Sequence, residues 1–170
     1  LKTLDWLDLN YDNNPFFLWV DTFQVHEPWY PPRPYRDMYD PDYEGEIVIA
    51  PKYGRHELLS EAEARHARAL YAGDVTFTDH WVSKLLDKLR DTGLYDRTLI
   101  IITADHGHYH GEHDNTWGKP QGTLYDEVNR IPLLVHHPDM EGGKRIEGIV
   151  QPADVSSSIL DAVGVDLPET

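Results

Sequence analysis

The sequence predicts an α/β fold with a mostly parallel sheet flanked by helices. Three short runs rich in β-branched and aromatic residues have the length of buried strands: residues 16–23, 99–103 and 131–136. A long amphipathic stretch separates the first run from the second, and a helical pattern follows the third. Apolar strands joined by a helical crossover are typical of parallel sheets covered on both faces. Three strands are few for such a sheet, which indicates a partial domain.

The N-terminal third is expected to contain a helix, a strand and a loop. Leu4 and Leu7 have roughly helical spacing, and Tyr11–Pro15 is a turn cluster. The predicted strand Phe16–Phe23 follows. Residues 28–58 then form an irregular loop rich in Pro and Tyr, of the kind that often carries function.

The remaining elements have clear end signals. Ser60-Glu-Ala-Glu63 is a capping box that begins a long helix, and Thr92-Gly93 is a signal for its C-terminus. The strands 99–103 and 131–136 come next. Asp154 is expected to cap a last helix that Gly164 ends. Residues 1–170 are assigned to one partial domain.

Composition excludes several classes of protein. The formal net charge is −15, from 15 basic and 30 acidic residues, and phosphate contacts need clustered Lys and Arg, so no nucleic-acid partner is expected. No apolar run approaches the length of a membrane span. The absence of Cys excludes disulfides and thiolate metal sites within the chain and leaves the cellular compartment open.

The segment Thr103–His113 holds four His, one Asp and one Glu. Asp105 and His106 directly follow a predicted strand, where ligands bind in open α/β sheets. A carboxylate beside an imidazole can bind one divalent cation, so we predict a metal site there. The alternative is a turn-capping Asp105 beside an ordinary loop histidine. His108, His110 and His113 could form a separate zinc site. His113 with Glu112 could instead anchor the loop, and either of the other two could reach substrate.

Two further residues are candidates for catalysis. Lys119, between Gly118 and Pro120, could hold an anion, although a solvated surface Lys is the alternative. His26 follows the first predicted strand and is expected to have an extended backbone before Glu27-Pro28. It could donate a proton to a leaving group, or simply pack against neighbouring aromatic rings.

Several segments, in order, resemble the sulfatase family of the alkaline phosphatase superfamily. They are residues 16–29 with a His-x-Pro element, 71–89, 98–107 with the Asp-His pair, 111–113, 117–119, 127–135 and 154–164. The resemblance implies that Asp105 and His106 bind a divalent metal. It also implies that Lys119 and His26 contact the transferred group and the leaving oxygen.

The family's nucleophile is a formylglycine made from Cys or Ser in a Cys/Ser-x-Pro/Ala-x-Arg motif, which this sequence does not contain. The resemblance therefore implies the C-terminal part of a sulfatase-like catalytic domain. We expect the full-length protein to hydrolyse a small-molecule or carbohydrate sulfate ester, and the isolated chain to be inactive. The incomplete sheet should expose a strand edge, which favours self-association.

His106 occupies a position where the family often has Asn, and Asp-His also resembles the phosphonate monoester and phosphodiester hydrolases of the superfamily. Ca²⁺ is the expected metal for a sulfatase, and Mn²⁺ or Zn²⁺ for those relatives. A third hypothesis is a non-catalytic metal-binding fragment, because two ligands leave most of a calcium coordination shell unfilled.

Overall fold

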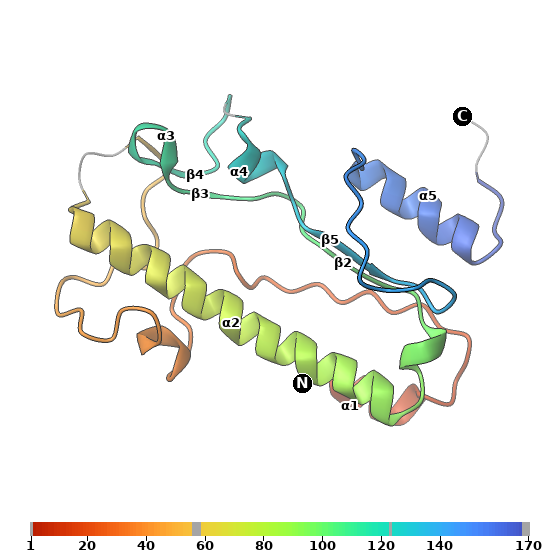
Figure 1. Ribbon diagram of the computed structural model, residues 1–170. Helices are drawn as coiled ribbons and strands as arrows, with labels where there is room; N and C mark the ends of the chain where they lie inside the picture. Colours follow the sequence, from red (N-terminus) through yellow and green to blue (C-terminus); the bar gives the residue numbers. More distant parts are fainter. Residues whose placement is uncertain (1, 56–58, 123, 168–170) are drawn as a thin grey trace. The chain divides into compact units, whose positions relative to one another are not determined.

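The computed structural model describes residues 2–55, 59–122 and 124–167, which fall into two compact units, Leu1–Pro138 and Asp139–Thr170. The helical elements are α1 (Lys2–Asn10), η1 (Tyr35–Asp37), α2 (Glu61–Asp91), η2 (Tyr95–Arg97), α3 (Glu112–Asn115), α4 (Asp126–Asn129) and α5 (Pro152–Ala162) (Figure 1). The strands are β1 (Gly54–Arg55), β2 (Ile100–Thr103), β3 (Tyr109–Gly111), β4 (Thr116–Gly118) and β5 (Leu133–His136). None of the described helices is long and apolar enough to cross a bilayer.

The long helix α2 confirms the predicted end signals. Ser60 is the N-cap, and its hydroxyl accepts a hydrogen bond from the Glu63 amide while the Glu63 carboxylate accepts one from the Ser60 amide. At the other end, Gly93 adopts φ +68°, which costs glycine little, and the chain turns back there. Gly73, inside α2, lets η1 approach, because a Cβ there would lie 2.4 Å from the Tyr35 carbonyl oxygen.

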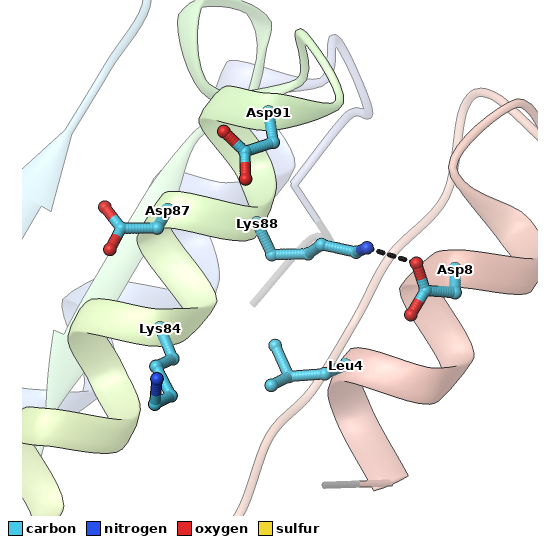
Figure 2. Close-up of a pocket in the computed structure, with 6 residues that line it drawn as sticks. All are labelled: Leu4, Asp8, Lys84, Asp87, Lys88 and Asp91. Atoms are coloured by element: carbon cyan, nitrogen blue, oxygen red, sulfur yellow. Dashed lines mark hydrogen bonds and ion pairs between the residues drawn. The ribbon is translucent and has the colours of Figure 1, made fainter.

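The C-terminal part of α2 packs against α1. The buried side chains of Leu7, Leu89 and Leu94, here called the Leu89 cluster, stabilise this contact. Figure 2 shows the polar groove beside it, where the Lys88 ammonium donates to the Asp8 carboxylate. The groove is lined by Leu4, Asp8, Lys84, Asp87, Lys88 and Asp91. The predicted N-terminal helix is thus confirmed, and it is fixed by apolar burial.

The predicted parallel sheet is not confirmed. β2 and β5 form where strands were expected, but they pair antiparallel, with Ile100 opposite His136 and Thr103 opposite Leu133. A second small sheet in the order β1-β4-β3 is also antiparallel and was not predicted. Its strands are two or three residues long, too short for a periodic pattern to develop in the sequence.

The predicted strand Phe16–Phe23 is wrong for this structure. These residues form no ladder with any described segment, and a strand requires a hydrogen-bonded neighbour. Phe16 and Leu18 pack against the Leu89 cluster, whereas Phe17 and Trp19 are 71% and 72% exposed. The alternation of a strand is therefore present only over residues 16–19, since Val20 and the residues up to 23 are all exposed.

The loop predicted for residues 28–58 is irregular apart from η1 and β1, and residues 56–58 lie outside the described part. Its start is fixed by Trp29, which is fully buried and donates its backbone N–H to the Ile49 carbonyl. The Trp29 cluster joins this loop to α2 and β4 through the buried side chains Trp29, Ala64, Ala67, Leu70 and Trp117.

The second unit contains α5. Gln151, not Asp154, is its N-cap; Asp154 lies at the third helical position, where its carboxylate accepts a hydrogen bond from the Gln151 amide. An acidic side chain in the first turn can accept hydrogen bonds from the same free N–H groups as an N-cap side chain. This explains why Asp154 was predicted as the cap although the helix begins after Gln151. Gly164, at φ +70°, follows the helix as predicted.

Candidate functional site

His26 and Lys119, which are 93 residues apart in the sequence, meet in the structure. The Lys119 Nζ lies 3.1 Å from the His26 Nε2. The other imidazole nitrogen, Nδ1, lies 2.7 Å from the Glu27 carbonyl oxygen, which can only accept a hydrogen bond, so Nδ1 carries the proton. Nε2 therefore presents its lone pair and accepts from the Lys119 ammonium.

The backbone at His26 is a turn, not the extended segment that was predicted. The His26 amide donates to the Phe23 carbonyl at 2.9 Å, and the imidazole packs on the Phe23 ring with centroids 4.7 Å apart. Lys119 follows β4 directly, after Gly118 at φ +83°. The pair is thus held by a turn on one side and by the small antiparallel sheet on the other.

Glu27 lies beside this pair. Its carboxylate accepts a hydrogen bond from the Tyr53 hydroxyl, and Oε2 lies 3.4 Å from His26 Nδ1 and 3.7 Å from His108 Nδ1. Burial raises the pKa of Glu27, but the Tyr53 hydroxyl, the residue's own backbone and the two histidines together bring that pKa below its usual value. Burial and the Glu27 hydrogen bond raise the pKa of Tyr53 to about 12, so Tyr53 remains a donor.

Asp105 and His106 lie on the loop that follows β2, as predicted. The His106 amide donates to Asp105 Oδ1 at 2.9 Å. The loop is fixed against α4, since the Gly107 amide donates to the Val128 carbonyl at 2.7 Å and the His108 amide to the Glu127 carbonyl at 3.0 Å. A Cβ at Gly107 would lie 1.9 Å from the Glu127 carbonyl oxygen, so only glycine permits this approach.

The chemistry of this pair fits two ligands of one divalent cation. His106 Nδ1 lies 2.9 Å from the Gly107 carbonyl oxygen, which assigns the proton to Nδ1 and leaves Nε2 with its lone pair. Nε2 lies 3.3 Å from Asp105 Oδ2, a separation at which an imidazole nitrogen and a carboxylate oxygen could both contact one cation. The Asp105 side chain is 85% exposed and accessible. Across the described residues, no group of three or more such side chains is arranged to hold a metal, so the pair is half of a site at most.

His108 and His110 belong to an aromatic cluster around Trp29. Their ring centroids lie 5.1 and 5.2 Å from that of Trp29, and His110 lies 4.1 Å from Tyr71. Burial lowers the pKa of each imidazole to about 4, because charging a ring there would cost solvation. No separate zinc site forms among the described His, Asp and Glu side chains.

His113 anchors its loop, with a different partner from the one predicted. Its Nε2 lies 3.0 Å from the Glu127 carboxylate, and its ring stacks on Tyr125 at 3.8 Å. Glu112 instead accepts a hydrogen bond from the His110 amide at 2.6 Å. His113 has φ +50° and begins the left-handed turn assigned to α3.

Sequence reasoning missed Glu27 and Tyr53. Glu27 was read only as a neighbour of Pro28, and Tyr53 was one of many tyrosines in the loop. An acidic side chain next to a candidate catalytic histidine was the only signal, since 26 residues separate Glu27 from Tyr53.

Comparisons with known proteins show what this chain is similar to. The Sulfatase family model matches residues 1–165. An arylsulfatase of Clostridium perfringens is 24% identical over 99% of the chain and 38% of its own length. The phosphonate monoester hydrolase SpPMH from Silicibacter pomeroyi superposes with a TM-score of 0.80, is 26% identical, and is matched over 97% of this chain and 38% of its own.

A third relative is BT4656, solved in complex with its substrate D-glucosamine-2-N,6-O-disulfate. It superposes with a TM-score of 0.59, is 28% identical, and is matched over 66% of this chain and 23% of its own. The chain thus spans less than two-fifths of the length of these relatives. The structural match assigns an alkaline phosphatase-like fold. The family match over residues 1–165 shows that the chain belongs to the sulfatase family.

Proposed function

We propose that the full-length protein is a metal-dependent sulfatase, and that this chain supplies one side of its active site. The observation that carries the proposal is the 3.1 Å contact between Lys119 and His26. Ester hydrolysis develops negative charge on the transferred group and on the leaving oxygen. An ammonium and an imidazole that distant segments bring together can stabilise these two charges. A sulfated sugar or other small sulfate ester is the proposed substrate, as in the BT4656 complex.

Each side chain has a distinct role in this proposal. Lys119 neutralises negative charge on the transferred group, and its positive charge requires no proton transfer. His26 accepts a hydrogen bond at Nε2 in the resting state, so it must gain a proton there before it can protonate the leaving oxygen. Its Nδ1 keeps its proton throughout, and the hydrogen bond that Nδ1 donates to the Glu27 carbonyl oxygen fixes the ring.

Asp105 and His106 would hold the metal, with Ca²⁺ as the proposed ion and Mn²⁺ or Zn²⁺ as alternatives. When bound, a divalent cation polarises ester oxygens and orients a nucleophile. The nucleophile itself is proposed to be a formylglycine outside this chain, which would then be the C-terminal part of the catalytic domain. The isolated chain should be inactive.

Substitution in the full-length protein tests the proposal. Lys119→Ala should lower kcat/KM for 4-nitrophenyl sulfate and for a sugar sulfate by about 10² or more, and His26→Ala should do so for the sugar sulfate, whose leaving oxygen needs a proton. Lys52→Ala, an exposed lysine in the preceding loop, is the control and should leave kcat/KM unchanged. Full activity in both site variants would refute the assignment, as would a metal-supplied wild-type protein that hydrolyses neither sulfate nor phosphate esters.

A phosphonate monoester or phosphodiester hydrolase is the second candidate. Two observations favour it: the Asp105-His106 pair and the TM-score of 0.80 with SpPMH. Relative kcat/KM on paired aryl sulfate and aryl phosphonate substrates separates the two reactions. A third candidate, a non-catalytic metal-binding fragment, predicts no turnover of any ester by the isolated 170 residues and weak binding of Ca²⁺.

A further inference from the structure

One carboxylate, that of Glu27, connects the two halves of the proposed site. Oε2 lies 3.4 Å from Nδ1 of His26, and the same oxygen lies 3.7 Å from Nδ1 of His108. His108 is two residues beyond His106, and its own amide is fixed to α4 by the hydrogen bond to the Glu127 carbonyl. Glu27 therefore lies between the turn that carries His26 and the loop that carries Asp105 and His106.

The surroundings of this carboxylate show that it is built into the fold. Its side chain is 11% exposed, and Oε1 accepts from the Tyr53 hydroxyl. Oε2 is buried without a hydrogen-bond partner, and the imidazoles of His26 and His108 lie 3.4 and 3.7 Å from it. A buried anion in this position also offsets the Lys119 ammonium on the far side of His26.

We propose that Glu27 is a positioning residue, which holds the His26 turn against the His108 loop so that Nε2 of His26 faces Lys119 and the leaving oxygen. This inference rests on the proposed hydrolysis of an ester. Glu27 touches neither the transferred group nor the leaving group in this scheme and acts only through His26. Tyr53 fixes the carboxylate from the other side.

Leaving-group dependence separates a positioning role from a merely structural one. A sugar or alkyl sulfate has a basic leaving oxygen that needs a proton, whereas 4-nitrophenolate leaves readily without one. In the full-length protein, Glu27→Gln should lower kcat for the sugar sulfate about tenfold and kcat for 4-nitrophenyl sulfate less than about twofold, with little change in KM. A loss of folded protein would lower both rates equally.

Two further variants sharpen this test. Tyr53→Phe removes the donor but keeps the carboxylate, and should show the same preference at smaller amplitude. Glu27→Gln in a His26→Ala background should have no additional effect, because the residue through which it acts is gone. Glu44→Gln, an exposed carboxylate in the same loop, is the matched control and should leave both rates unchanged. Equal losses on both substrates, or additive losses in the double variant, would overturn the inference.

A crystal structure of the Glu27→Gln protein decides the question without substrate. The inference expects His26 Nε2 to move beyond hydrogen-bond distance of Lys119 Nζ, about 3.5 Å. An unchanged contact overturns it. Because this readout needs no turnover, an inactive wild-type protein would refute the proposed function while the structure still tested the role of Glu27.

Discussion

Replacing Gly107 by Ala should displace the loop that carries Asp105 and His106. The added Cβ would lie 1.9 Å from the Glu127 carbonyl oxygen, so the two backbones must separate by about 1 Å or more. The hydrogen bonds from the Gly107 and His108 amides, at 2.7 and 3.0 Å, would then exceed hydrogen-bond distance. Each bond contributes about 1 kcal/mol, so the free energy of unfolding should fall by about 2 kcal/mol.

The proposed binding of a metal by Asp105 and His106 should weaken as well, since metal–ligand distances tolerate only a few tenths of an ångström. Urea unfolding and calorimetric titration with Ca²⁺ and Mn²⁺, both on the full-length protein, measure the two effects. We expect metal affinity to fall about tenfold or more. Gly142→Ala is the control, because a Cβ there meets nothing within 4 Å. If Gly107→Ala matched wild type in both stability and metal affinity, the close packing of this loop on α4 would be refuted.

Three other properties can be checked. The pKa of His110 is about 4 in the fold and about 6.5 when unfolded, so acidification protonates the unfolded chain first and destabilises the fold. Between pH 7 and pH 5, the free energy of unfolding measured by urea titration should therefore fall by about 2 kcal/mol more for wild type than for His110→Phe. Ser60→Ala should lower the free energy of unfolding by about 1 kcal/mol, by loss of the α2 cap; Ser60→Asp, which can still cap, should not. The 170-residue chain alone should self-associate through exposed side chains such as Phe17 and Trp19, and a clean monomer in sedimentation velocity would contradict this.

Signals that lie within one element predicted that element well. The capping box at Ser60 and the glycine at residue 93 mark the two ends of α2, because caps act through neighbouring backbone groups. β2 and β5 form where apolar runs predicted strands. The run Phe16–Phe23 is also apolar and aromatic, but no described strand forms hydrogen bonds with it. The sequence pattern alone therefore predicted a strand that does not form here.

Contacts between distant segments were harder to predict. His26 and Lys119 were each chosen as candidates, but only the fold shows that they touch. Glu27 was missed because its contacts with Tyr53 and His108 join three segments that are far apart in the sequence. The expected partner of His113 was its neighbour Glu112, whereas the structure pairs it with Glu127 across the loop.

The helix α2 carries two separate apolar clusters, and this affects how the molecule can open. The Trp29 cluster contacts its N-terminal half and the Leu89 cluster its C-terminal end. A helix of this length spans about 46 Å, so both clusters pack on the same helix but do not form one continuous core. Local opening near Trp29 would leave the contact with α1 intact. A local opening around His26 and His108 would therefore not require the opposite end of α2 to separate from α1.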